Sequence, residues 1–226
     1  MSYILNIETA TKNCSVSLSK DGKLLDVINH REDGYSHAEK LHLCIDEILK
    51  RNNLDLKKLS AVAVSKGPGS YTGLRIGVST AKGLAYGLNI PLIAVSTLEH
   101  MARQIKKENA FIIPLIDARR MEVYAAVFDE NHNSVREIKA EIIDENSFSE
   151  YLDQKKVYFI GDAVPKTKEA ISHPHAIFIE DSYPSAKEMA SLSYQKFLEE
   201  NFEDTAYFEP FYLKDFIVTR KKKPLL

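Results

Sequence analysis

The sequence lacks three features that would each assign a chain of 226 residues to a broad class. It has no apolar run near the roughly 18 residues that a membrane-spanning helix needs, and its first residues include no basic segment of the signal-peptide type. Its two cysteines, Cys14 and Cys44, follow no regular spacing, which favours buried, reduced thiols over a disulfide framework. We therefore predict a cytoplasmic protein that does not contact the membrane.

An excess of positive charge is also missing. Lysine and arginine number 30 against 32 aspartates and glutamates, giving a formal net charge of -2. A protein that holds nucleic acid unaided usually carries a strongly basic balance, so any RNA contact has to be local or made by a partner. A short cationic run, Arg220 to Lys223, lies in the tail and could touch RNA, although short charged termini are usually only solvated.

The common catalytic and metal-binding signatures are absent as well. The sequence contains no H-E-x-x-H, no G-x-S-x-G around a serine, and no G-x-x-x-x-G-K-[ST] loop. His37 and His42 are five residues apart, which on a helix separates them by about 140° and keeps them from sharing an ion. We predict no protein-bound metal and no activated serine nucleophile.

The first half of the chain does contain regular apolar patterns. Asp21-Gly22 separates two alternating runs and predicts a β-hairpin. Ser36-x-x-Glu39 has the form of a helix capping box and precedes apolar residues at helical spacing. The predicted order is β-β-β-α-β-α-β, with strands near 4–7, 14–19, 24–28, 61–64 and 91–95 and helices near 37–51 and 74–88.

A similar order begins again after residue 96. Capping boxes at Ser96–Glu99 and Ser185–Glu188 predict helices over 97–107 and 185–200. Further elements are predicted as strands at 111–116, 123–128, 135–143, 157–160 and 176–179 and a short helix at 147–153. Two such rounds indicate two related lobes, 1–102 and 103–226, with the last helix and tail able to pack back on the first lobe.

A glycine-rich loop joins the strand at 61–64 to the following helix. Its backbone amides at a helix N-terminus could bind a phosphate, and the glycines could equally serve a tight turn that brings the helix close to the sheet. The spacing alone leaves both interpretations open. The residues concerned are Gly67, Gly69, Ser70, Thr72 and Gly73.

The helix after this loop is unusually rich in small residues, which are Gly73, Gly77, Ser79, Thr80, Ala81, Gly83, Ala85 and Gly87. Each interior glycine costs about 1 kcal/mol relative to alanine, so a compensating interaction is expected. Close approach of the helix is the obvious candidate. It could be to the sheet beneath or to a helix of another subunit.

Several strings together resemble the TsaB family, also called YeaZ, and the resemblance covers nearly the whole chain. They are I-L-N-I-E-T-A-T at 4–11, K-G-P-G-S-Y-T-G-L-R-I-G at 66–77, A-K-G-L-A at 81–85, D-A-R-R-x-E-V-Y at 117–124, G-D at 161–162 and E-P-x-Y-L at 209–213. The resemblance implies an α/β protein with the two-lobed, duplicated fold of actin, hsp70 and sugar kinases, which is ribonuclease H-like.

The resemblance also implies that this chain is not a catalyst. The related transferase TsaD has a metal-binding H-x-x-x-H, whose histidines align with Thr97 and Met101 here, and a thioether is a poor ligand for the ions of such sites. Glu8 stands where an aspartate is typical of the first phosphate loop. Gly161-Asp162 replaces the glycine pair that usually contacts adenosine.

By resemblance, the chain is the partner that TsaD needs to form N6-threonylcarbamoyladenosine at position 37 of tRNA, in a cycle that also uses TsaE. It is expected to form a homodimer when alone, to touch tRNA only through its partner, and to need no cofactor of its own, although ADP or ATP could lie at the partner interface. The predicted contact residues are Leu41, Ile45, Leu74, Gly77, Val78, Ala81 and Lys82.

Two other functions stay open. A nucleotide-hydrolysing enzyme of the actin-like fold would use the loop at 67–73 to hold phosphates. A peptidase would need a nucleophile or a metal, which the sequence does not supply in recognisable form. Asp117-Ala118-Arg119-Arg120 offers an acid and two bases at a strand end, where we predict a structural salt bridge.

Overall fold

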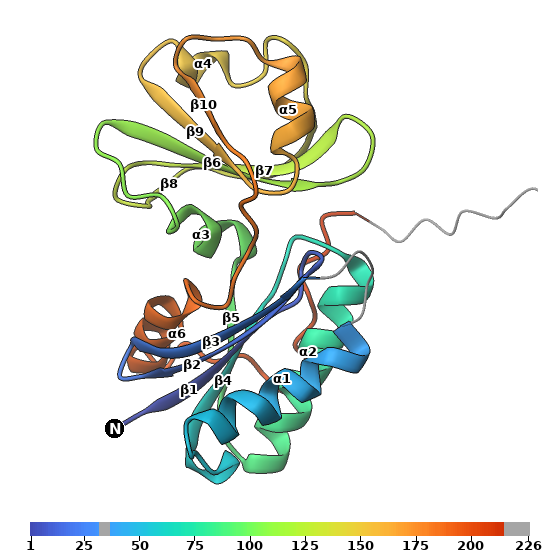
Figure 1. Ribbon diagram of the computed structural model, residues 1–226, viewed down its shortest axis with the longest axis vertical. Helices are drawn as coiled ribbons and strands as arrows, with labels where there is room; N and C mark the ends of the chain where they lie inside the picture. Colours follow the sequence, from blue (N-terminus) through green and yellow to red (C-terminus); the bar gives the residue numbers. More distant parts are fainter. Residues whose placement is uncertain (32–36, 215–226) are drawn as a thin grey trace, which may run out of the picture.

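The computed structural model describes residues 1–31 and 37–214, which form two lobes, each built on a five-stranded sheet (Figure 1). The first sheet has the strand order β3-β2-β1-β4-β5, and the second has β8-β7-β6-β9-β10. In both, the first three strands are antiparallel and the last two run parallel to the first. This equivalence confirms the predicted duplicated α/β fold.

The strands lie close to their predicted positions. Those of the first sheet are β1 Tyr3–Glu8, β2 Asn13–Lys20, β3 Lys23–Arg31, β4 Leu59–Ser65 and β5 Leu92–Val95. Those of the second are β6 Ala110–Asp117, β7 Glu122–Phe128, β8 Ser134–Ile142, β9 Lys156–Ile160 and β10 Ala176–Ile179. Asp21 and Gly22 both have positive φ, 49° and 78°, which is the backbone that an Asp-Gly hairpin turn requires.

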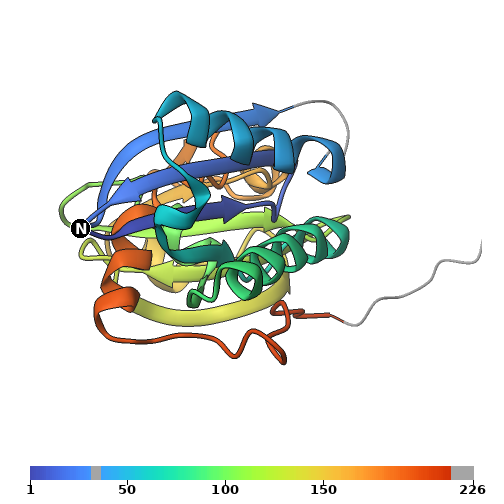
Figure 2. The same ribbon diagram turned by 90° about the horizontal axis from the view of Figure 1, so that it is seen from below.

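Two helices, α1 His37–Arg51 and α2 Tyr71–Leu88, cover one face of the first sheet (Figures 1 and 2). A 3₁₀ turn at Leu56–Lys58, which the sequence analysis does not assign, leads from α1 into β4. Helix α2 begins at Tyr71 rather than at 74 because the Ser70 side chain accepts a hydrogen bond from the Gly73 backbone and caps it. Cys14 and Cys44 are free buried thiols between α1 and the sheet, as predicted.

Each lobe receives a helix from the other part of the chain. Helix α3, Thr97–Ala102, was assigned to the first lobe, but its side chains pack on β6 and β7 of the second. Helix α6, Met189–Leu198, packs on the face of the first sheet opposite α1 and α2, in line with the predicted return of the last helix (Figure 1). The position of a helix in the sequence therefore does not show which lobe it packs in.

The second lobe also contains α4, Ser149–Leu152, and α5, Val164–Ala170, which pack on the face of its sheet away from α3. Helix α5, which is seven residues long, is not among the predicted elements. None of the helices in the described parts of the chain is long and apolar enough to cross a membrane.

The capping boxes gave correct helix positions but poor boundaries. Ser96 makes no side-chain cap bond to α3, and α3 ends at 102 rather than 107. The Ser185 hydroxyl donates to Asn29 at 3.0 Å instead of capping a helix, and α6 begins only at Met189. Ser36, the first of the three capping residues, lies outside the described residues.

Candidate functional site

The glycine-rich loop packs against the segment that follows β1. An added side chain at Gly69 would collide with Ala10, and one at Gly73 would collide with the Thr9 carbonyl. At Gly67, φ is 106° and an added Cβ would lie 2.9 Å from the Phe211 carbonyl oxygen. Tight packing and a left-handed backbone therefore account for these glycines.

Backbone groups at the start of α2 are already engaged within the protein. The Ser70 amide donates to the Ala10 carbonyl at 2.7 Å, and the Leu74 amide donates to the Ser70 carbonyl at 2.8 Å. The Gly73 amide donates to the Ser70 hydroxyl at 3.2 Å. The phosphate interpretation of this loop, with the exposed Thr72 at its end, stays a prediction, and the close-packing interpretation has direct structural support.

Ser70 shows no sign of nucleophilic activation. Its hydroxyl accepts from a backbone amide, and no histidine or carboxylate of the described residues is hydrogen-bonded to it. A serine nucleophile needs an adjacent base within hydrogen-bond reach. The structure offers no support for a serine peptidase centred on this residue.

A buried acid–histidine pair lies near the junction of the two lobes, and the sequence analysis missed it. Glu8 Oε2 and His100 Nε2 are 2.5 Å apart, and both side chains are completely buried. The second oxygen of Glu8 accepts from the Ala10 amide at 2.5 Å, so the carboxyl group is held on both sides. His100 belongs to α3 and Glu8 ends β1, so the pair ties the second-lobe helix to the first sheet.

Thr97 and Met101, which the family resemblance sets against the metal-binding histidines of TsaD, are both completely buried in α3. Met101 packs among apolar residues of α3 and the second sheet. Within residues 1–31 and 37–214, no three His, Cys, Asp or Glu side chains are grouped as metal ligands. The side chains at this place therefore do not fit the donor set of a transition-metal site.

Most of the predicted partner contacts are core residues, which corrects their assignment as surface groups. Helices α1 and α2 turn their apolar stripe toward the sheet, so the stripe is covered within the monomer. Gly77 lies against Thr9, with no room for a side chain. The buried residues are Leu41, Ile45, Leu74, Gly77, Val78 and Ala81.

Lys82 is the only predicted contact residue outside the core, and it is partly buried. Its ammonium group donates to the carbonyls of Ala206 and Phe208 at 3.1 and 3.0 Å. It therefore fastens the C-terminal segment to α2. A partner would meet this lysine only at the edge of its binding surface.

The exposed sides of α1 and α2 do offer apolar groups. Leu43 on α1 is 63% exposed and Tyr86 on α2 is 83% exposed. Gly83 and Gly87 on α2 have nothing within 4 Å of an added Cβ, so this part of the helix presents bare backbone. The outer face of the two helices is therefore accessible. It carries apolar side chains, and at Gly83 and Gly87 no side chain would block the approach of another helix.

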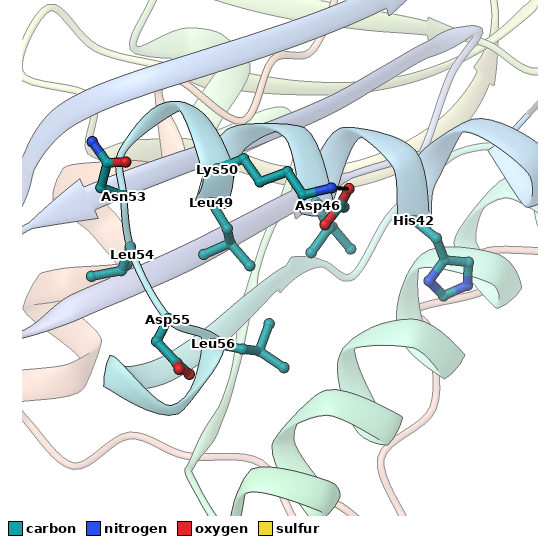
Figure 3. Close-up of a pocket in the computed structure, with 9 residues that line it drawn as sticks. His42, Asp46, Leu49, Lys50, Asn53, Leu54, Asp55 and Leu56 are labelled. Carbon is teal, nitrogen blue, oxygen red and sulfur yellow. Dashed lines mark hydrogen bonds and ion pairs between the residues drawn. The ribbon is translucent and has the colours of Figure 1, made fainter.

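A groove of about 680 Å³ lies along the C-terminal half of α1 (Figure 3). Figure 3 shows Asp46 joined to Lys50, and the hydrogen bond between them is 2.6 Å long. Polar side chains of α1 and of the loop after it share the groove with leucine and isoleucine side chains. Its lining residues are His42, Ile45, Asp46, Leu49, Lys50, Asn53, Leu54, Asp55 and Leu56.

Comparison with known proteins places the chain in a family. Residues 31–222 match the family model described as TsaD, tRNA N6-adenosine threonylcarbamoyltransferase. The chain is 30% identical to the tRNA threonylcarbamoyladenosine biosynthesis protein TsaB of Bacillus subtilis, over 74% of each chain. The chain belongs to this family and, within it, to TsaB.

Other TsaB relatives match over a smaller part of their length. The TsaB protein of Escherichia coli is 39% identical over 135 residues, which span 58% of this chain and 57% of that protein. The solved structure of YeaZ from Pseudomonas aeruginosa has a TM-score of 0.78 and 23% identity, covering 94% of this chain and all of that one. At that identity the structural likeness supports the fold.

The D-A-R-R string of this TsaB-family chain forms the turn between β6 and β7. Asp117 does form a structural salt bridge, but its partner is Lys166 of α5 and not an arginine of the string. Arg119 and Arg120 have positive φ, 73° and 53°, and are exposed. Neither guanidinium forms an ion pair with a described residue.

Asp162, in the G-D string, accepts a hydrogen bond from the Asp117 amide at 2.8 Å. Burial, with a smaller effect of the nearby Asp117 charge, raises the pKa of this carboxyl group from 3.8 to about 6. The preceding Gly161 has φ of 116°, and an added side chain would collide with the Leu115 carbonyl. The G-D pair thus has a packing role at the end of β9.

Asp162→Asn is expected to stabilise the protein at about pH 7.5 and not at about pH 4. Because the folded pKa lies above the unfolded one, the stabilising contribution of the protonated form is complete below about pH 4 and is lost as pH rises through about 6. Asparagine keeps an acceptor for Asp117 without the charge. The gain at neutral pH should be roughly 1–2 kcal/mol, or about 2–8 °C in Tm.

Thermal unfolding at the two pH values measures this effect. Asp153→Asn serves as the control, because the Asp153 side chain is 75% exposed. It should change Tm little at either pH. An Asp162→Asn effect of equal size at both pH values would show that the charge of Asp162 is not the cause.

Proposed function

We propose that this chain is the non-catalytic subunit that TsaD requires to form N6-threonylcarbamoyladenosine at position 37 of tRNA. The observation that carries the proposal is family membership, since relatives at 30–39% identity are named tRNA threonylcarbamoyladenosine biosynthesis protein TsaB. The match to the TsaD family model over residues 31–222 supports a common ancestry with the transferase.

We infer the absence of a catalytic role from the residues at the junction of the two lobes. Enzymes with such a duplicated fold have their active site at this junction. Glu8 is engaged by His100 and by the Ala10 amide, so it has no free oxygen directed at a substrate. Thr97 and Met101 stand where the related transferase has its metal-binding histidines. These features favour a subunit that acts on its partner rather than on a substrate.

The docking surface is the outer face of α1 and α2. It carries the exposed Leu43 and Tyr86, and the groove beside α1 continues it toward the loop before β4 (Figure 3). Apolar side chains exposed on neighbouring helices are typical of protein interfaces. When TsaD is absent, a second copy of the chain would occupy the same face, so the homodimer and the heterodimer compete.

The remaining parts of the proposed cycle belong to other proteins. TsaE would act on the assembled complex, and tRNA would be held chiefly by TsaD. ADP or ATP, if bound, would lie at the contact between the two subunits, and titration of nucleotide into the complex and into each subunit measures this. Nucleotide binding to the isolated chain alone would instead favour an ATPase of the actin-like fold.

Replacing Leu43 or Tyr86 by glutamate is expected to weaken TsaD binding by about 30-fold or more for each substitution, the effect of losing a central interface residue. The free energy of unfolding should change by less than about 0.5 kcal/mol, because both side chains are exposed. Calorimetric titration of purified TsaD into each variant measures the affinity. Sedimentation of the isolated variants should show monomers where the unchanged chain is dimeric.

Leu198→Glu is the matched control. Leu198 is 65% exposed on α6, on the opposite face of the first sheet (Figure 1). It should leave TsaD affinity unchanged. If the α6 variant weakens binding and the α1 and α2 variants do not, the docking surface is misplaced.

A further inference from the structure

A second surface, which adjoins the apolar docking face on α2 because Arg75, Lys82 and Tyr86 share one stripe of the helix, combines cations with aromatic rings. It starts in a pocket of about 380 Å³ between α2 and the segment that follows Ala206. The segment runs beside α2 and ends near the second lobe (Figure 1). The pocket is lined by Tyr71, Arg75, Val78, Ser79, Lys82, Phe208, Glu209, Pro210, Tyr212 and Lys214.

The aromatic part of this pocket is a stacked group. The rings of Tyr71 and Tyr212 have centroids 4.7 Å apart and are tilted by 32°. The Arg75 guanidinium lies 4.8 Å from the Tyr71 ring centroid. Both rings are partly exposed. Tyrosine rings and arginine planes are the groups on which unstacked RNA bases settle.

The cationic part continues from the pocket onto the second lobe. Lys214 forms an ion pair with Glu122, the first residue of β7. Lys166 donates to the carbonyls of Arg120 and Glu122 at 2.8 and 2.6 Å. The Lys214–Glu122 pair therefore connects the pocket to the β6–β7 turn of the second lobe, so the two form one continuous surface.

The charge of this surface contrasts with that of the whole chain. We define the basic band as Arg75, Lys82, Arg119, Arg120, Lys166 and Lys214. The carboxylates beside it are Asp117, Glu122 and Glu209, and the partly exposed Asp162 accepts from the Asp117 amide. The net charge of the protein is -2, so this excess is local. Past Lys214 the sequence adds Arg220, Lys221, Lys222 and Lys223.

Arg119 and Arg120 are the available charges of the band. The nearest acids in sequence, Asp117 and Glu122, are paired with Lys166 and Lys214, and neither arginine has an ion pair with a residue in the described part of the chain. Both side chains are exposed at the tip of a tight turn. Arginines held without a carboxylate partner are suited to phosphate, which they bind in a bidentate manner.

We propose that the basic band binds the phosphodiester backbone of RNA, so that this chain holds the tRNA directly beside its partner. The inference rests on the proposed function for the identity of the RNA. It differs from the sequence prediction that tRNA is touched only through TsaD. The Tyr71–Tyr212 pair favours RNA over an acidic protein, because flat bases gain from stacking and carboxylate side chains do not.

Fluorescence anisotropy with an unmodified tRNA transcript tests the proposal. The full chain should bind the transcript at low salt, with an affinity that falls steeply between about 20 and 200 mM salt. The double variant Arg119→Gln with Arg120→Gln should weaken binding about tenfold. The slope of log affinity against log salt concentration should become shallower by the amount expected for about one to two lost phosphate contacts. Lys57→Gln with Lys58→Gln, two exposed cations near the groove of Figure 3, should change neither quantity.

TsaD affinity, measured in parallel, separates this inference from the proposed function. The arginine variant is expected to bind TsaD normally and tRNA weakly, both alone and in the complex. Four results overturn the proposal: no tRNA binding by the chain at about 20 mM salt, equal losses in both double variants, competition by polyglutamate as effective as by RNA of equal charge, or loss of TsaD affinity in place of tRNA affinity. The first three leave the TsaD partnership intact.

Discussion

Substitution of Gly77 by leucine is expected to destabilise the first lobe by about 3 kcal/mol, the upper range for overpacking a close contact. An added side chain at Gly77 would collide with Thr9 Oγ1, which itself donates to the Gly73 carbonyl at 2.8 Å. From the sequence, the same substitution is expected to spare the fold and weaken partner binding. The buried position of Gly77 changes that expectation to a loss of stability.

Gly83→Leu is the matched control on the same helix. An added Cβ at Gly83 meets nothing within 4 Å, and leucine has a higher helix propensity than glycine. This variant should therefore gain roughly 0.5–1 kcal/mol in the free energy of unfolding. Urea unfolding of both variants measures the difference. Similar effects at Gly77 and Gly83 would show that propensity, and not close packing against Thr9, decides the stability of α2.

Removal of one member of the Glu8–His100 pair is expected to cost about 3–5 kcal/mol, because the remaining polar group would be buried without its partner. Both side chains are completely buried, and the pair links β1 to α3. Glu8→Ala and His100→Ala should each lower Tm by roughly 6–20 °C. The double variant should lose clearly less than the sum of the two single losses.

A surface ion pair provides the comparison for the Glu8–His100 variants. Lys50 and Asp46 form an ion pair at 2.6 Å on the surface of α1, and such pairs contribute little. Lys50→Ala should cost less than about 0.5 kcal/mol. If the two single losses at Glu8 and His100 add without coupling, the two side chains do not depend on each other and the proposed link between the lobes is absent.

The sequence predicted local structure well where a local signal decides it. Asp21-Gly22 fixes its hairpin through two positive φ angles, and α1 begins and ends at the predicted residues. Prediction was weaker where tertiary packing sets a boundary. Helix α3 stops five residues early, and the Ser185 hydroxyl binds Asn29 of the first lobe instead of capping a helix.

Six of the seven predicted partner contacts are buried within the monomer, for a reason that the sequence contains. Leu74, Gly77, Val78 and Ala81 recur at i, i+3, i+4 and i+7, which is the stripe that a helix turns toward its own core. The small-residue composition drew attention to α2 as a docking helix, but it did not separate its faces. Gly77 and Gly83 differ by about 240° around the helix, so one is packed and the other open.

The Glu8–His100 pair had no local signal at all. The two residues are 92 positions apart and meet only because the chain passes from the first sheet into a helix that packs on the second. The continuity of the basic band is likewise a product of the fold, since α2, the β6–β7 turn and Lys214 come from three distant parts of the sequence. Spacing along the chain cannot reveal such groupings.

Reconstitution of tRNA modification tests the proposed function most directly. Purified TsaD and TsaE, with the separate enzyme that by the family resemblance makes threonylcarbamoyl-adenylate, are incubated with the substrates of that enzyme and unmodified tRNA, with this chain present or absent. We expect N6-threonylcarbamoyladenosine to form only when the chain is added, and never when the chain replaces TsaD. Modification that proceeds equally well without the chain, or that the chain supports in the absence of TsaD, would contradict its role as a required non-catalytic partner.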